Sequence, residues 1–120
     1  MDKQSRIFIA GHQGLIGSAC LRKFQSLGYT NILVRTHAEL ELLDSAAVSD
    51  FFHAQKPDYV ILASGKVGGI VENRRAPAEF MTKNLQMQLN VFAAAHATNI
   101  KRLLFFGSSC MYPRECAQPM

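Results

Sequence analysis

The sequence has few of the residues that metal centres and disulfide scaffolds require. It contains three cysteines and four histidines, and neither set has the spacing of a metal site. An odd number of free thiols is typical of a reducing compartment. No signal peptide is visible because the apolar run after residue 6 is short, and no run approaches the roughly 18 residues of a membrane span. We therefore expect a cytoplasmic protein with no metal site and no membrane partner.

Positively charged residues are only slightly in excess of negatively charged ones. Thirteen Lys and Arg residues against nine Asp and Glu residues give a formal net charge of +4 at pH 7. The basic residues are scattered and are not interleaved with aromatics, so nucleic acid is not an expected partner. The excess suits an anionic ligand, and a solvated basic surface is the alternative interpretation.

The chain is organised around residues 6–17, RIFIAGHQGLIG. A short apolar run with β-branched residues is followed by three glycines and then by apolar residues at helical spacing, which is the context of a dinucleotide-binding motif. Gly11 would allow a tight turn, Gly14 would let the backbone approach a pyrophosphate, and Gly17 would let the helix pack close to the strand. Taken alone, the motif also fits a plain tight turn. The cofactor-binding residues expected here are Gly11, Gly14, Leu15, Ile16 and Gly17.

Strands and helices alternate along the 120 residues, which form one domain at most. Such alternation implies right-handed crossovers and a parallel sheet. The predicted class is therefore α/β, an incomplete Rossmann-type parallel sheet with flanking helices and strand order 3-2-1-4. The third helix carries a wide apolar stripe, so we expect it to be largely buried. The expected strands are residues 7–10, 31–35, 59–62 and 103–106, and the expected helices are residues 15–27, 45–55 and 77–98.

The end of the second predicted strand indicates which dinucleotide would bind. NAD sites usually place Asp or Glu there, whereas a 2′-phosphate requires a cation. This strand ends in Arg35, whose planar guanidinium suits a phosphate, and His37 is close enough to help. We therefore predict NADP rather than NAD, and the alternative is an arginine on a solvated turn. Asp44 either meets the adenine or only caps the following helix.

Four segments carry a more specific resemblance: GHQGLIG, KPDYVILAS, SGKVGGI and GSSCMYP. Together they resemble the GDP-L-fucose synthases, a family of extended short-chain dehydrogenases/reductases, and the resemblance spans residues 6–120. It implies the amino-terminal, NADP-binding part of an enzyme that epimerises GDP-4-keto-6-deoxymannose at C3 and C5 and reduces it at C4. It also implies a homodimer in the complete form and a carboxyl-terminal substrate domain that these residues do not include.

The resemblance assigns roles to two loops. Ser108 would polarise a substrate carbonyl, and Cys110 would transfer protons during epimerisation. The loop after the third strand would lie beside the nicotinamide and the sugar. Asn84, an amide on an apolar helical face, is either an anchor behind the site or a satisfied core residue. The remaining expected site residues are Ala63 and Lys66 for the cofactor, and Val67, Gly68, Gly69, Asn84 and Ser109 at or behind the substrate.

The sequence departs from the family in several places. No tyrosine precedes a lysine by four residues, so the family's Tyr-x-x-x-Lys pair is missing from these residues. Gln13 and His37 stand where the family often has arginine near the cofactor phosphate, and Gly65 stands where it usually has alanine. We therefore expect no turnover by this chain on its own. The alternatives are a non-catalytic dinucleotide-binding module and another sugar-nucleotide epimerase or dehydratase of the extended family.

Overall fold

A computed structural model describes residues 1–64, 77–107 and 115–118. All seven expected elements are present, with most ends within one residue of prediction. The second strand is the exception, because it is confined to two residues. The elements are β1 (Ile7–Ala10), α1 (Leu15–Ser26), β2 (Ile32–Leu33), α2 (Ser45–Gln55), β3 (Tyr59–Leu62), α4 (Pro77–Ala97) and β4 (Arg102–Phe105).

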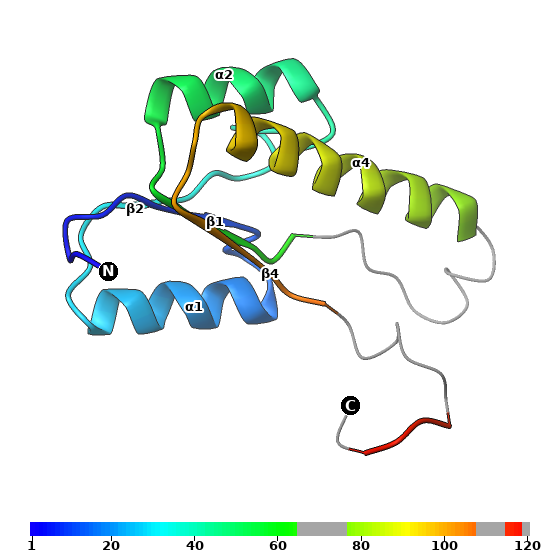
Figure 1. Cartoon of the computed structure of the whole chain (residues 1–120), viewed down its shortest axis with the longest axis horizontal. Helices are drawn as coiled ribbons and strands as arrows, with labels where there is room; N and C mark the ends of the chain where they lie inside the picture. Colours follow the sequence, from blue (N-terminus) through cyan, green and yellow to red (C-terminus); the bar gives the residue numbers. More distant parts are fainter. Residues whose placement is uncertain (65–76, 108–114, 119–120) are drawn as a thin grey trace.

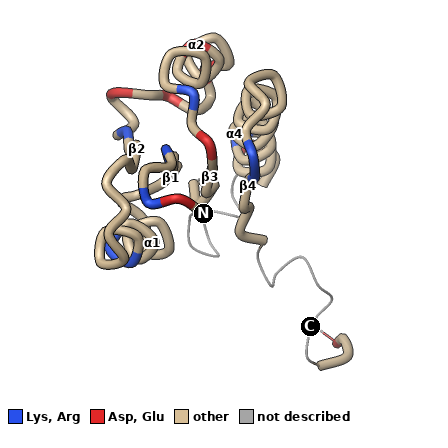
Figure 2. The backbone as a smooth tube through the Cα atoms, turned by 60° about the vertical axis from the view of Figure 1, so that its left-hand side comes forward, with Lys and Arg blue, Asp and Glu red and all other residues tan. Residues whose placement is uncertain are grey.

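The four strands form one parallel sheet in the order β2-β1-β3-β4, with helices on both sides of it (Figure 1 and Figure 2). The predicted α/β class is confirmed, but the predicted strand order 3-2-1-4 is wrong. Residues 36–44 form no strand beyond β2, and Leu40 and Leu42 bury their side chains in the core from an irregular segment. The crossover through α2 then returns the chain to the far side of β1. The strand order therefore reverses between β1 and β3, where a ligand crevice is expected.

Helices cover the two faces of the sheet unequally (Figure 2). On one face, Phe8, Val60 and Leu62 pack into a core with residues of α2 and α4. On the other face, Ile7 and Ile9 pack in a smaller cluster with residues of α1. The alternation of side chains along β1 thus explains why all four of its residues are buried.

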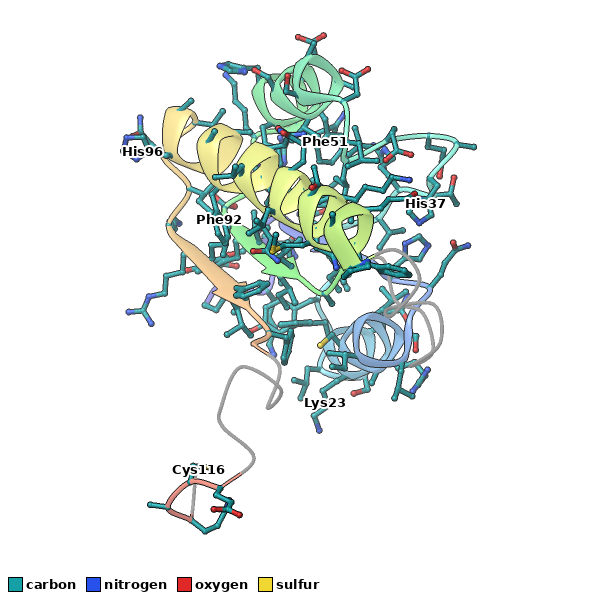
Figure 3. The ribbon with its side chains drawn as sticks, turned by 90° about the vertical axis from the view of Figure 1, so that its right-hand side faces the viewer. Lys23, His37, Phe51, Phe92, His96 and Cys116 are labelled. Atoms are coloured by element: carbon teal, nitrogen blue, oxygen red, sulfur yellow. The ribbon has the colours of Figure 1, made fainter. Side chains whose placement is uncertain are left out.

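Helix α4 is less buried than its sequence suggests. Its inner side follows the predicted stripe, and Phe80, Met87 and Val91 are buried. Its outer side is exposed, with Met81 at 62% and Leu89 at 60%, so the expectation of a largely buried helix is wrong. The reason is that the described part of the chain has one helix beside α4, namely α2, and nothing against the outer side. Figure 3 shows α4 side-on, with Phe92 beneath it.

Among the described residues, no helix combines the length and the apolar character needed to cross a bilayer. In the same parts of the chain, no three His, Cys, Asp or Glu side chains gather in a way that would hold a metal ion.

Candidate functional site

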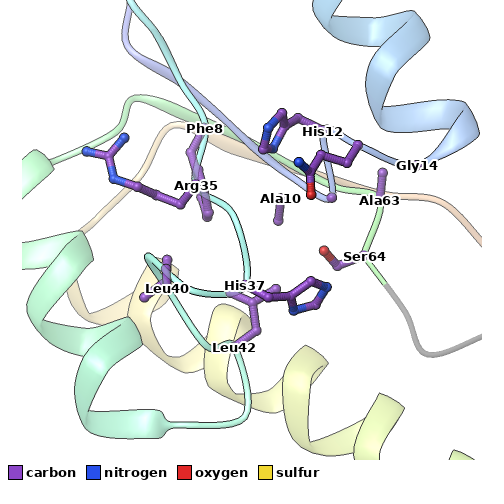
Figure 4. A pocket seen from close by; sticks show the side chains of 12 residues that line it. Phe8, Ala10, His12, Gly14, Arg35, His37, Leu40, Leu42, Ala63 and Ser64 are labelled. Atoms are coloured by element: carbon purple, nitrogen blue, oxygen red, sulfur yellow. The ribbon is translucent and has the colours of Figure 1, made fainter.

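A crevice of about 170 Å³ opens at the carboxyl ends of β1 and β3 (Figure 4). It lies where the strand order reverses, which is the usual ligand position in an open α/β sheet. Its size gives room for part of a dinucleotide. The crevice is lined by Phe8, Ala10, Gly11, His12, Gln13, Gly14, Arg35, His37, Leu40, Leu42, Ala63 and Ser64.

Two glycines hold the floor of the crevice together. Gly11 has φ +88°, and a Cβ there would lie 2.8 Å from backbone atoms of Ala63 and Ser64. A Cβ on Gly17 would lie 1.9 Å from the carbonyl oxygen of Gly11. The predicted tight turn and close helix approach are therefore both confirmed. The same contacts place Ala63 in the crevice, as the sequence predicted.

The amino terminus of α1 is open to an anion. Gly14 is its N-cap residue and supplies no side-chain hydrogen bond, so the first-turn N–H groups have no capping side chain. Leu15 and Ile16 are exposed there, and the nearest atom to a Cβ on Gly14 would be 3.5 Å away. Helix N-termini of this kind bind phosphates through unpaired N–H groups and the positive end of the helix dipole. The pyrophosphate role of these residues remains a prediction.

Helix α2 begins differently, because it carries its own cap. The Asp44 carboxylate accepts a hydrogen bond of 3.1 Å from the Ala47 N–H. Asp44 does not line the crevice, so of its two expected roles the structure shows the helix cap.

Arg35 lines the crevice, as the NADP prediction requires, but its guanidinium is already engaged. Its Nη1 donates a 2.7 Å hydrogen bond to the Val34 carbonyl, and its Cζ lies 5.2 Å from the centre of the Phe51 ring. A guanidinium has five N–H donors, so donors remain for a phosphate. The stacking fixes the stem of the side chain at the rim of the crevice.

The carboxylate of Glu39, which is not among the predicted site residues, lies close to Arg35. The Thr36 N–H donates to Glu39 Oε1 at 2.9 Å, and the Glu39 N–H donates to Thr36 Oγ1 at 3.3 Å. The pKa of Glu39 is lowered, first by the backbone N–H of Thr36, then by its hydroxyl, and to a smaller extent by the charges of Arg35 and His12. Glu39 therefore stays ionised and adds negative charge beside the end of β2.

Several lining residues were not predicted as site residues. His12 lies inside the glycine motif, and Leu40 and Leu42 come from the irregular segment between β2 and α2. The sequence holds only local signals for them: an imidazole within the glycine motif, and two leucines two residues apart after a polar turn. Whether these side chains point into the crevice depends on the path of the loops, which the periodicity of apolar residues does not predict.

The buried amide of α4 is Asn90, and Asn84 is half-buried. Asn90 Nδ2 donates to the Leu42 carbonyl at 2.7 Å, and Asn90 Oδ1 accepts from Gln86 Nε2 at 2.7 Å. This pair of bonds ties α4 to the wall of the crevice. The sequence placed such an anchor at Asn84, whose assigned role remains a prediction.

The structure thus brings together Gly11, Gly14, Arg35 and Ala63, which are four of the predicted cofactor residues. Seven other predicted site residues lie outside the described parts of the chain, so their roles remain predictions. They are Lys66, Val67, Gly68, Gly69, Ser108, Ser109 and Cys110.

The sequence of the chain is similar to those of known proteins. The chain is 53% identical to GDP-L-fucose synthase 1 of Arabidopsis thaliana over 119 residues, which are 99% of this chain and 37% of that protein. It is 49% identical to GDP-L-fucose synthase of Escherichia coli K12 over 120 residues, again 37% of that protein. The chain therefore spans little more than a third of the length of these relatives.

The fold is matched in solved structures as well. A GDP-mannoheptose C4 reductase from Campylobacter jejuni, solved with NADP bound, superposes with a TM-score of 0.94 at 38% identity, covering 100% of this chain and 38% of that one. The sequence profile of the NAD dependent epimerase/dehydratase family matches residues 7–120. The chain belongs to the NAD dependent epimerase/dehydratase family.

Proposed function

We propose that the crevice binds NADP(H) and that this chain is the amino-terminal, cofactor-binding part of a GDP-L-fucose synthase. The observation that carries the proposal is the convergence of an uncapped helix terminus and Arg35 on one crevice at the β1/β3 reversal. The identity of 53% to an Arabidopsis GDP-L-fucose synthase supports the choice of enzyme, and the NADP-bound Campylobacter reductase supports the choice of cofactor.

The described residues fit such a cofactor. Backbone N–H groups at the start of α1, at Leu15 and Ile16, would bind the pyrophosphate, and the open space at Gly14 leaves room for it. Apolar side chains of Leu40 and Leu42 line the wall on which a base would rest. Arg35 would bind a 2′-phosphate with the donors that Val34 does not use.

The proposed substrate is GDP-4-keto-6-deoxymannose, by similarity to the named relatives. When bound, the cofactor would supply a hydride for the C4 ketone. Ser108 and Cys110 follow β4 and Gly107 in the sequence, so they would enter the site from the carboxyl end of the neighbouring strand. Their proposed roles are carbonyl polarisation for Ser108 and proton transfer at C3 and C5 for Cys110. The Tyr-x-x-x-Lys pair is not among these 120 residues, so the role proposed for them is mainly to bind.

Calorimetric titration of the chain with NADPH and NADH tests the proposal. We expect tighter binding of NADPH. Arg35→Ala should remove most of that preference, because a charge-assisted phosphate contact contributes about 1.5–3 kcal/mol. Arg22→Ala is the matched control, since Arg22 is exposed on α1 and does not line the crevice. Equal affinity for the two cofactors in the unmutated chain would contradict the proposal.

A further inference from the structure

We propose that His12 and His37 add a pH-dependent part to the selectivity that Arg35 gives for the cofactor's 2′-phosphate, so that the preference for NADPH over NADH increases as the pH falls. The inference rests on the proposed function and adds a form of regulation to the same site. Its starting point is that both imidazoles line the crevice, one from the turn after β1 and the other from the loop after β2 (Figure 4).

The permanent positive charge of the crevice is small. Among the described residues that line it, Arg35 is the one Lys or Arg side chain. Figure 4 shows its guanidinium extending away from the two imidazole rings, in agreement with its bond to the Val34 carbonyl and its position over Phe51. The two histidines therefore supply the charge that can change within the crevice.

The opposing charges come from the loop after β2. Glu41 Oε2 lies 4.0 Å from His37 Nδ1, and Glu39 is held by Thr36 with a lowered pKa. Helix α1 has no acidic residue in its first turn, and the residues that follow β3 contribute the neutral Ser64. When both imidazoles are neutral, Glu39, Glu41 and Arg35 together carry one net negative charge. When both imidazoles are protonated, the net charge of this group becomes positive.

This charge balance matters for one ligand group in particular. A phosphate monoester carries nearly two negative charges at pH 7, because its second pKa is about 6. An imidazole gains its charge between about pH 5 and 8, and the protonated ring donates from both nitrogens. Binding of NADPH should therefore take up more protons between about pH 8 and 6.5 than binding of NADH, which has the same pyrophosphate but lacks the 2′-phosphate. Below about pH 6 the phosphate itself gains a proton and the increase should stop.

The experiment measures the ratio of NADH to NADPH dissociation constants for the chain at pH 6.5, 7.5 and 8.5. The ratio should rise toward low pH, by about tenfold for each unit by which the phosphate shifts an imidazole titration. Repeating the NADPH titration in buffers of different ionisation enthalpy measures proton uptake directly in the unmutated chain. This second measurement does not depend on how any variant folds.

Three variants locate the effect. His37→Gln should flatten most of the pH dependence, and His37→Arg should keep a high ratio at pH 8.5, because the charge is then permanent. His96→Gln is the matched control, since His96 is exposed at the far end of α4 from His37 and should leave the pH profile unchanged (Figure 3).

The outcomes separate this inference from the proposed function. NADPH preference that is the same at all three pH values, with no proton uptake, would overturn the histidine inference and leave the NADP site standing. Absence of NADPH binding at every pH would overturn both. Loss of pH dependence in His96→Gln would overturn the assignment to the crevice.

Discussion

Strands β1 and β4 have similarly apolar sequences and opposite environments. All four residues of β1 are buried, whereas in β4 Leu104 is 52% and Phe105 is 38% exposed. β1 has a strand on each side and helices over both faces, while β4 pairs only with β3 among the described strands. A short, mainly apolar segment therefore specifies a strand. The strands and helices packed around that strand determine how much of it is buried.

The contrast extends to the two faces of β4. Leu103 packs against the core beneath α4, and Phe105 meets the Phe92 ring edge-on at 6.0 Å. On the other face, Leu104 borders a groove of about 480 Å³ with Phe24 and Ile61. The covered side of the molecule shares Phe8, Leu40 and Leu42 with the crevice, and the groove marks the side where α1 does not reach β4.

Deleting matched phenylalanine rings should show the largest difference between the two regions. Phe52 is fully buried in α2, so Phe52→Ala should lower the free energy of unfolding by about 3–5 kcal/mol. Phe105→Ala should cost about 1 kcal/mol, because much of its ring is already in water. Urea denaturation of both variants measures the difference. Equal losses would mean that β4 is covered in solution.

The glycines beneath the crevice form the next comparison. Gly17→Ala should lower the free energy of unfolding by about 2–3 kcal/mol, because the new Cβ would meet the Gly11 carbonyl and backbone atoms yield poorly. Gly14→Ala adds a Cβ at ordinary contact distance, so it should leave stability nearly unchanged while weakening NADPH binding. Thermal melts and cofactor titrations separate the two effects. A stable Gly17→Ala variant would contradict the close packing of α1.

Local features could be predicted from the sequence because they depend on neighbours along the chain. The turn at Gly11, the close approach at Gly17 and the possible cap at Asp44 all follow from residue type and short spacing. The sequence also predicts Arg35 at the ligand site, since it ends the second predicted strand, and Arg35 does line the crevice although β2 itself ends at Leu33.

The strand order could not be predicted, because a short apolar strand does not specify on which side of β1 the chain returns after α2. β3 pairs with β1 on the side away from β2, and Leu40 and Leu42 pack into the core beside α2 and α4. The choice between Asn84 and Asn90 depends on that same segment. Asn90 is the buried amide because the Leu42 carbonyl lies opposite it, and no pattern within α4 reveals this.

The Asn90 contact gives a smaller, more specific test of the covered side. Asn90→Ala should lower the free energy of unfolding by about 2 kcal/mol, because the Leu42 carbonyl would lose its donor inside the protein. Gln86→Ala removes the exposed partner of the same side chain and should cost less than about 1 kcal/mol. Since Leu42 also lines the crevice, Asn90→Ala should weaken NADPH binding and Gln86→Ala should not. Equal effects of the two variants would show that the bond to Leu42 has no special role.

The smallest expected change in stability is at the exposed face of β4, where Leu104→Lys should alter the free energy of unfolding by no more than about 0.5 kcal/mol. The adjacent Leu103→Lys is the matched control, because it would place a charge beneath α4 and should cost several times more. Although nearly neutral for stability, Leu104→Lys should reduce binding of a hydrophobic dye and light scattering, since charge on an edge strand opposes association through exposed apolar surface. Unchanged dye binding, together with a large loss of stability in Leu104→Lys, would show that this face is buried in solution. The exposure of β4 relative to β1 would then describe a single copy of the chain and not the protein in solution, where β4 would be covered.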